Sequence, residues 1–302
     1  MKRIIITGAT GLIGTRLVSL LKGRYDLTIL TRSPEKYRNK DYIRYLYWDG
    51  KSDITQLLEN AGGVINLLGE NIGRRTWSNK QKHLITESRK DAATAIQKSI
   101  EKCVIKPNVW IQASATGYYG QKSHTVFDET SPKGDNSFLA DVCEAWERPI
   151  NELNAREVRK VIIRTGVVLS AQSDFCKQLS LSFGFGIASI LGDGKQYTPW
   201  IHLDDEVKAI RFLLENDACS GIFNLVAPQS ATMEEIVDAM KQIRKNMMTV
   251  HIPVWILNMA FGKEKTSEII MTNQHVIPER LLEKGFVFKY PDIVKAVKDL
   301  ER

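Results

Sequence analysis

Short apolar, β-branched runs alternate with longer amphipathic segments along the first half of the chain. The runs that predict strands are Arg3–Thr7, Leu27–Thr31, Ile43–Trp48, Gly63–Leu67, Val109–Ser114 and Lys160–Thr165. The segments that predict helices are Leu12–Lys22, Ile54–Asn60, Asn79–Lys102 and Phe138–Ala155. Apolar strands alternating with helices indicate repeated βαβ units, in which a parallel sheet is covered on both faces. The pattern predicts an α/β fold with a doubly wound parallel sheet of the Rossmann type.

The second half of the chain is less regular. Ser180–Gly194 is rich in Gly and Ser and predicts a loop or a short helix over the site. Further elements are expected as strands at Tyr197–Leu203 and Gly221–Val226, helices at Asp204–Glu215 and Ala231–Lys245, and a last helix that begins near Pro291. The apolar segment Val250–Phe261 is expected to pack with Ile269–Lys284. We therefore expect a Rossmann domain over residues 1–226, with 170–196 on its substrate side, and a small mixed C-terminal subdomain over 227–302.

Composition excludes several classes of protein. The 302 residues are 43% hydrophobic and 25% charged, as in ordinary soluble globular proteins. The net charge of +7 is spread among acidic residues and comes with no helix-turn-helix or zinc-finger signature, so no nucleic-acid partner is expected. Four cysteines lie far apart without a CxxC pair, which favours free thiols in a reducing compartment. The apolar run at the N-terminus ends at Ile6, and no stretch approaches about twenty apolar residues. We expect a cytoplasmic protein without a membrane partner.

The strongest functional signal is a glycine triplet between the first strand and the first helix. Gly8, Gly11 and Gly14 stand in the order Gly8-Ala9-Thr10-Gly11-Leu12-Ile13-Gly14. In this context the first glycine permits a tight turn, the second lets the backbone approach a pyrophosphate, and the third allows close packing of helix and strand. The helix N-terminus then offers free N–H groups to the phosphates. The motif predicts a dinucleotide site.

The end of the second strand predicts which dinucleotide binds. An NAD-specific site usually places Asp or Glu there, to bond the 2′-hydroxyl of the ribose. This sequence has Thr31-Arg32-Ser33 instead. A carboxylate would repel a 2′-phosphate, whereas a guanidinium pairs with it. We therefore predict NADP(H), with Arg32 as the chief discriminator and Thr31 or Ser33 assisting.

Two further strand ends are expected at the same edge of the sheet. Asn66–Asn71 follows the fourth strand and should pass beneath the nicotinamide ribose, and Ala113–Gly120 presents hydroxyls towards the ring.

Arg74–Trp77 is either a loop that receives an anionic substrate or a solvated loop with one anchoring Trp. His202 before Asp204-Asp205 is expected to make a structural hydrogen bond rather than a charge relay. No cluster has metal-ligand spacing, so no metal is predicted.

At this point the sequence resembles the extended short-chain dehydrogenases/reductases of the NAD-dependent epimerase/dehydratase superfamily. The matching segments are Thr7–Gly14, Ser114–Gly120, Arg164–Leu169, Trp200–Asp205 and Phe223–Leu225. More narrowly it is similar to the atypical "epimerase family protein" branch with its distinctive C-terminal domain. The tags for that branch are Gly69–Ile72, Pro199–His202 and Val276–Leu282. The resemblance spans essentially the whole chain.

The resemblance implies NADP contacts at Thr31-Arg32, at Leu67-Leu68, at Arg89 and near Val168. Together with the strand ends, the predicted cofactor-binding residues are Gly8, Thr10, Gly11, Leu12, Ile13, Gly14, Thr31, Arg32, Leu67, Leu68, Gly69, Glu70, Arg89, Ser114 and Val168. The superfamily also uses a Tyr-x-x-x-Lys pair, in which Lys lowers the pKa of the tyrosine. That pair should fall near Phe138–Glu144, where no Tyr precedes a Lys by four residues.

Two functions are therefore compared. The first is an NADP(H)-dependent oxidoreductase or epimerase with a non-standard proton donor, acting on an unspecified small molecule. Its catalytic candidates are Ser114, Tyr119 and Asp141. Tyr118, Cys143 and Glu144 are further candidates for the proton donor, and the spacing selects none of them. The second is a non-catalytic NADP(H)-binding sensor or regulator. An open pocket over C4 of the nicotinamide, with an ionisable group in reach, would favour the enzyme. A pocket filled with apolar side chains would favour the sensor. The chain is expected to be a monomer, or a homodimer through Asn79–Lys102 and Phe138–Ala155, as the family resemblance suggests.

Overall fold

The computed structural model describes residues 1–73, 75–121, 125–134, 137–243 and 248–300. Its centre is a seven-stranded parallel sheet in the order β12-β7-β5-β4-β1-β2-β3. These strands are β1 (Arg3–Thr7), β2 (Asp26–Thr31), β3 (Ile43–Tyr47), β4 (Gly63–Asn66), β5 (Val109–Ala115), β7 (Arg159–Thr165) and β12 (Gly221–Leu225). The order reverses between β1 and β4, as in a doubly wound sheet. The predicted fold class is confirmed.

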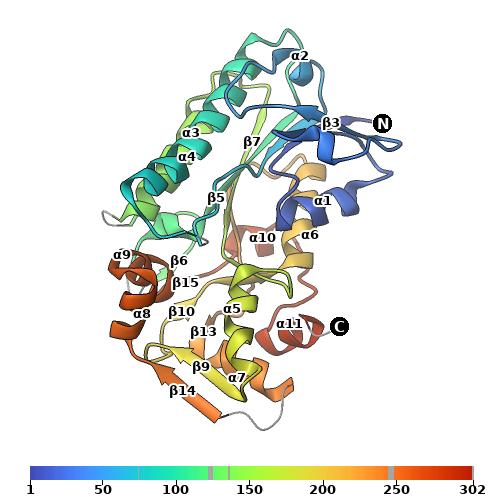
Figure 1. Cartoon of the computed structure of the whole chain (residues 1–302). Coiled ribbons are helices and arrows are strands. Elements are labelled where there is room, and N and C mark those ends of the chain that lie inside the picture. Colours follow the sequence, from blue (N-terminus) through green and yellow to red (C-terminus); the bar gives the residue numbers. More distant parts are fainter. Residues whose placement is uncertain (74, 122–124, 135–136, 244–247, 301–302) are drawn as a thin grey trace.

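The middle of β1 is apolar on both faces because helices cover both faces of the sheet. Ile4, Ile5 and Ile6 of β1 are fully buried. The covering helices are α1 (Leu12–Leu21), α3 (Asn79–Lys102), α4 (Phe138–Glu152) and α6 (Leu203–Glu215), with a short α2 (Thr55–Leu58). Helices α3 and α4 pack together on one face, and α1 and α6 on the other (Figure 1). This arrangement leaves the carboxyl ends of the strands free for a ligand.

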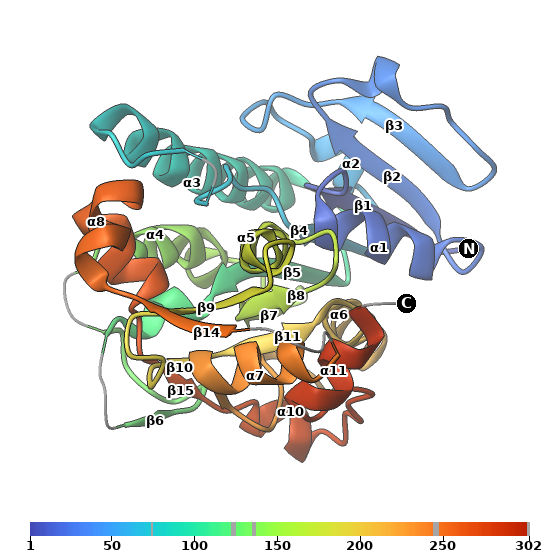
Figure 2. The ribbon, with the colours of Figure 1, turned by 60° about the horizontal axis from the view of Figure 1, so that its bottom comes forward.

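The second half of the chain adds small paired strands and short helices beyond that edge (Figure 2). The strand pairs are β6 (Val126–Phe127) with β15 (His275–Val276), β8 (Val167–Leu169) with β11 (Trp200–His202), β9 (Ile187–Leu191) with β14 (Met248–Ile252), and β10 (Tyr197–Thr198) with β13 (Ala231–Thr232). The helices are α5 (Asp174–Phe183), α7 (Met233–Ile243), α8 (Val254–Phe261), α9 (Lys263–Lys265), α10 (Glu279–Glu283) and α11 (Ile293–Leu300). Short 3-10 turns occur at η1 (Pro34–Lys36) and η2 (Thr116–Tyr119), and a π-helical turn at η3 (Thr266–Ile270).

These later elements share a second apolar core. Phe183 and Ile190, from the first part of this region, pack in one cluster with Ile236, Ala296 and Val297 from the C-terminal part. The apolar faces of α5 and β9 therefore pack against α7 and α11, whereas Leu281, Phe286 and Phe288 pack in the core of the main sheet.

Two element predictions were wrong in this region. Ser180–Gly194 was expected as a loop or short helix, but it contains the end of α5 and the strand β9. In β9 Ala188 and Ile190 point inwards in strict alternation, which the Gly-rich surroundings concealed. The single strand expected at Tyr197–Leu203 is two strands, because the chain changes partners at Pro199: β10 pairs antiparallel with β13 and β11 pairs parallel with β8.

Among the described residues, none of the helices combines the length and apolar composition that a membrane crossing requires.

Candidate functional site

The glycine turn joins β1 to α1 at the point where the strand order reverses. Gly8 has φ +67°, and a Cβ there would lie 2.5 Å from the carbonyl carbon of Leu67. A Cβ on Gly14 would lie 2.4 Å from Ala9 Cα. Gly11 is the N-cap of α1, whose first turn carries no acidic side chain. The turn is therefore tight, and it presents a helix N-terminus that suits an anion.

The neighbouring strand end is held in place by side-chain hydrogen bonds. Asn66 Oδ1 accepts from Thr7 Oγ1 at 2.5 Å and from the Leu68 N–H at 3.3 Å, and Asn66 Nδ2 donates to Gln112 Oε1 at 2.9 Å. All three polar side chains are buried. They fix the ends of β1, β4 and β5 relative to one another, which positions the backbone of Leu67 and Leu68 beside the glycine turn.

A groove of about 400 Å³ runs along these strand ends. Nine predicted cofactor residues line it: Gly8, Thr10, Gly11, Thr31, Arg32, Leu67, Leu68, Gly69 and Glu70. Leu12, Ile13 and Gly14 lie next to it, in the first turn of α1. The sequence analysis missed the other lining residues, which are Leu30, Trp48, Asp49, Gly50, Lys51, Leu84, Glu87, Ser88 and Asp91. The rule on strand ends could have found Trp48–Lys51, since that segment follows β3.

Arg32 lies at the end of β2 with its side chain exposed. Within the described chain its guanidinium makes no hydrogen bond and no ion pair. The other cation of the groove, Lys51, is already paired with Asp91 at 2.8 Å. Arg32 is thus the cation at this end of the groove that is available to an incoming phosphate.

Arg89 is placed quite differently, on the inner side of α3. It is 9% exposed, its Nη1 donates to the carbonyl oxygens of Glu70 (2.9 Å) and Ile85 (3.0 Å), and its guanidinium lies 4.6 Å from the ring centroid of Trp146. Burial lowers the pKa of Arg89 to about 10, so it remains a cation at neutral pH. A Cβ on Gly69 would lie 2.8 Å from Arg89 Cζ. A side chain at position 69 would therefore require the Arg89 guanidinium to shift.

Arg89 also lines a second cavity, of about 250 Å³, next to the groove. Most of its wall is apolar or small, and its described ionisable lining groups are Arg89, Cys143 and Glu268. The remaining lining residues are Ile72, Ala115, Thr116, Gly117, Leu139, Val142, Trp146, Thr165, Gly166, Val167, Thr198, Pro199, Ile269, Thr272 and Gln274. We call this cavity the apolar pocket. Val168 is partly buried beside it in β8 and packs on the main core.

The segment where a Tyr-x-x-x-Lys pair would stand forms one wall of the apolar pocket. Leu139, Val142 and Cys143 of α4 all line it. The Cys143 thiol lies 3.6 Å from the Ala115 carbonyl oxygen, and burial raises the pKa of Cys143 to about 11. The thiol is therefore neutral at physiological pH.

Ser114 and Tyr119 belong to a buried polar network behind the pocket. Ser114 Oγ donates to Glu147 Oε1 at 2.6 Å, and Glu147 receives Nε and Nη2 of Arg164 at 2.9 and 2.8 Å. Arg164 Nη1 donates to the Tyr119 hydroxyl, which donates to Asn224 Oδ1 at 2.7 Å. Burial raises the pKa of Tyr119 to about 12. Neither Ser114 nor Tyr119 is among the residues that line the apolar pocket.

Asp141 and Glu268 lie on opposite sides of the first turn of α4. Asp141 is exposed and pairs with Lys133 at 2.6 Å, outside the pocket. Glu268, on the π-helical turn η3, accepts from the backbone N–H groups of Phe138 (3.0 Å) and Leu139 (2.8 Å) and lines the pocket. The sequence analysis missed Glu268, because no motif marks a residue that the fold brings from 130 positions away.

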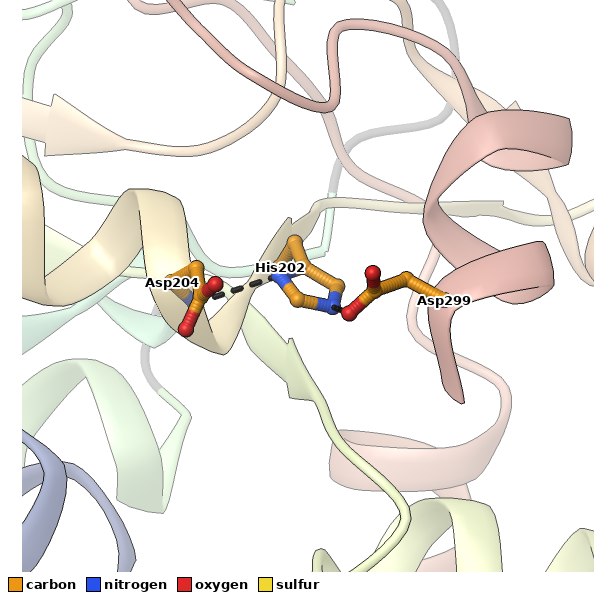
Figure 3. Close-up of side chains that lie close together, drawn as sticks. All are labelled: His202, Asp204 and Asp299. Atoms are coloured by element: carbon orange, nitrogen blue, oxygen red, sulfur yellow. Dashed lines mark hydrogen bonds and ion pairs between the residues drawn. The ribbon is translucent and has the colours of Figure 1, made fainter. Parts of the chain in front are cut away.

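His202, Asp204 and Asp299 also come together, which spacing along the chain did not indicate (Figure 3). His202 Nδ1 accepts from the backbone N–H of Asp204, so it caps α6, and its Nε2 lies 3.5 Å from Asp299. Asp204 is paired with Arg16 at 2.7 Å. Burial lowers the pKa of His202, which favours the neutral ring. The predicted structural hydrogen bond of His202 is confirmed. Because each group already has a protein partner, we assign the cluster to the junction between α6 and α11.

Comparison with known proteins identifies the family of this chain. Residues 4–226 match the model of the NAD dependent epimerase/dehydratase family, and residues 252–300 match a domain of unknown function. An epimerase family protein of Staphylococcus aureus is 31% identical over 301 residues, which cover 99% of both chains. The human epimerase family protein SDR39U1 is 29% identical, again over 99% of both chains.

Solved structures agree with this assignment. The crystal structure of human epimerase family protein SDR39U1 (isoform 2) with NADPH has a TM-score of 0.89 at 28% identity, and covers 99% of this chain and 98% of that chain. A nucleoside-diphosphate sugar epimerase of Corynebacterium glutamicum has a TM-score of 0.75 at 26% identity, and the match covers 98% of this chain and 57% of that chain.

Proposed function

The chain belongs to the NAD dependent epimerase/dehydratase family, and we propose that it is an NADP(H)-dependent oxidoreductase or epimerase of a small molecule. The observation that carries this proposal is the pair of adjoining cavities. The groove holds the glycine turn and the unpaired Arg32, and the apolar pocket begins at Arg89 next to it. The human relative crystallised with NADPH supports the choice of cofactor.

The residues of the groove fit a phosphorylated dinucleotide. The N-terminus of α1 suits the pyrophosphate, because Gly8 and Gly11 leave no side chain above it. Arg32 suits the 2′-phosphate, because its guanidinium is exposed and unpaired within the described chain. When bound, the nicotinamide supplies or takes up a hydride.

The apolar pocket has the features expected of a place for the reacting group. Its wall is mostly apolar, and the Arg89 cation can stabilise negative charge on a substrate oxygen. A carbonyl reduction also needs one proton on that oxygen. Among the described lining groups, we place this proton transfer on Glu268, since a carboxyl group can both give and accept a proton. Ser114 and Tyr119 then act as parts of the buried network, and Asp141 as a surface residue.

The cavity volume bears on the size of the substrate. At about 250 Å³ the apolar pocket is below the roughly 300–1,000 Å³ that drug-sized ligands occupy. We therefore propose a compact carbonyl or alcohol substrate. In this proposal Glu268, Ile269, Thr272 and Gln274 of the C-terminal part contribute to the wall around the substrate.

The alternative function is a non-catalytic NADP(H) sensor. One observation favours it, namely that Ser114, Tyr119 and Asp141 all lie off the pocket wall. The two functions are separated by a screen of NADPH oxidation with small aldehydes and ketones. Turnover that Glu268→Gln lowers at unchanged NADPH affinity supports the enzyme. Tight NADPH binding without turnover on any compound supports the sensor.

A further inference from the structure

A third cavity, of about 400 Å³, lies outside the groove and the apolar pocket, and we call it the basic cavity. Its wall includes Arg75 from the loop after β4, Lys177 from α5 and Lys265 from α9. These three cations come from three separate parts of the chain, and only the fold brings them to one cavity. Neither the groove nor the apolar pocket shares any of the residues that line it.

Lys265 is buried without a carboxylate partner among the described residues. It is 7% exposed, and its ammonium donates to the backbone oxygens of Gly73 and Arg75. Burial lowers the pKa of Lys265, as expected for a cation that has lost water and has no anion beside it. An unpaired buried cation is costly, which is why such groups commonly mark a place where an anion binds.

The other two cations are available as well. Arg75 and Lys177 are exposed, and within the described chain their side chains make no hydrogen bond or ion pair. The carboxylate of the described lining, Asp174, is already engaged by Asn71 Nδ2 at 3.1 Å. The described lining of the cavity therefore carries three cationic groups and one carboxylate that is already hydrogen-bonded. This excess of positive charge suits a dianion such as a phosphoryl group.

The basic cavity and the apolar pocket are lined by neighbouring residues of the same two segments. Ile72 lines the pocket and the next residue, Gly73, lines the basic cavity. Likewise Lys265 and Glu268, three residues apart, line the basic cavity and the pocket respectively. Consecutive Cα atoms are about 3.8 Å apart, so the two cavities are close neighbours at these segments.

We propose that the basic cavity binds the phosphoryl group of the substrate, while the carbonyl end of the same molecule enters the apolar pocket. This inference rests on the proposed function and specifies its substrate class as a small phosphorylated carbonyl or alcohol. The phosphates of the cofactor are not involved, because they belong to the groove.

The test is calorimetric titration of the NADPH-saturated protein with dihydroxyacetone phosphate, with dihydroxyacetone and with inorganic phosphate. The phosphorylated ketone should bind at least about tenfold more tightly than either of the others, because it alone engages both cavities. Lys177→Ala should weaken its binding about tenfold or more, the effect of losing one charge-assisted hydrogen bond. Lys22→Ala is the matched control and should change nothing, because Lys22 is exposed at the end of α1 and its ammonium has no ion-pair partner among the described residues.

Two results would overturn the proposal. The first is that the phosphorylated and unphosphorylated ketones bind alike. The second is that Lys177→Ala leaves the difference between them unchanged. Lys265→Met provides a second variant, but Lys177 is exposed and its replacement does not threaten folding. Failure of the proposed function has a different signature, since the unaltered protein would then either not bind NADPH or bind it without oxidising it in the presence of any carbonyl compound.

Discussion

Glu147 and Arg164 form a buried, two-point ion pair directly behind the apolar pocket. Their side chains are 4% and 2% exposed, and the Nη2–Oε2 distance is 2.8 Å. Glu147 also accepts a hydrogen bond from the Ser114 hydroxyl, and Arg164 donates one to the Tyr119 hydroxyl. Two of the catalytic candidates from the sequence, Ser114 and Tyr119, are therefore hydrogen-bonded to a buried salt bridge.

Removing one partner of this pair should destabilise the protein strongly. Glu147→Gln leaves the Arg164 cation buried without its counter-ion, so we expect a loss of about 3–5 kcal/mol in the free energy of unfolding. Urea unfolding followed by circular dichroism measures it. Asp141→Asn breaks the exposed Lys133–Asp141 pair and should cost at most about 1 kcal/mol. Equal losses in the two variants would contradict the structural role given to Glu147.

The glycine turn allows a matched comparison of two alanine substitutions. Gly8 and Gly23 have nearly the same backbone angle, with φ of +67° and +78°. A Cβ on Gly8 would collide with the Leu67 backbone, whereas a Cβ on Gly23 would meet nothing within 4 Å. Gly23→Ala should therefore cost only the strain of a positive φ, about 1–2 kcal/mol.

Gly8→Ala should cost clearly more than Gly23→Ala and should abolish NADPH binding, because the clash displaces the strand end beneath the cofactor. Unfolding free energies and fluorescence titration with NADPH measure the two effects. If Gly8→Ala bound NADPH like the unaltered protein, the close approach at Leu67 would not matter for the site.

Glu206 should make the protein less stable as the pH rises. Its side chain is fully buried, its only hydrogen-bond partner is Thr165 Oγ1 at 2.9 Å, and its Oε2 has no partner in the described structure. Burial raises the pKa of Glu206 from 4.5 to about 8. The folded protein therefore keeps this proton in a pH range where the unfolded chain has released it.

Between pH 4.5 and 8 the unfolded state binds fewer protons at this site, so this contribution to stability falls with rising pH, by about 5 kcal/mol at most. Glu206→Gln cannot ionise and should flatten that part of the profile. Unfolding free energies at pH 5, 6.5 and 8 measure the slope. Identical slopes in the variant and the unaltered protein would show that Glu206 is not the group responsible.

Glu268→Gln should separate cofactor binding from chemistry. Glutamine keeps one acceptor oxygen for the N-terminus of α4 but cannot transfer a proton, so turnover should fall about 100-fold or more while the Kd for NADPH stays the same. Initial rates with the best carbonyl compound of the NADPH-oxidation screen measure the loss. Asp141→Asn serves as the control and should retain full activity. The reverse pattern, with Asp141 essential and Glu268 dispensable, would contradict the assignment.

Much of the groove at the strand ends could be predicted because its residues follow local rules. The glycine turn and the ends of the strands recur at fixed places in a parallel sheet, so Gly8, Arg32 and Leu67 could be found from spacing alone. Glu268 and Lys265 could not, since their roles arise from contacts between distant parts of the chain. The strand β9 was missed for a similar reason: its stability comes from pairing with β14, about sixty residues later, rather than from a strong local propensity.

The central claim is that this chain uses NADP(H), with Arg32 as the group that recognises the 2′-phosphate. The most direct test is to measure Kd for NADPH and NADH by fluorescence titration in the unaltered protein, in Arg32→Ala and in Arg24→Ala, an exposed arginine away from the groove. We predict that the unaltered protein and Arg24→Ala prefer NADPH, and that Arg32→Ala weakens NADPH binding by about 10- to 100-fold while NADH binding stays the same. An unchanged preference in Arg32→Ala, or tighter binding of NADH by the unaltered protein, would contradict the account.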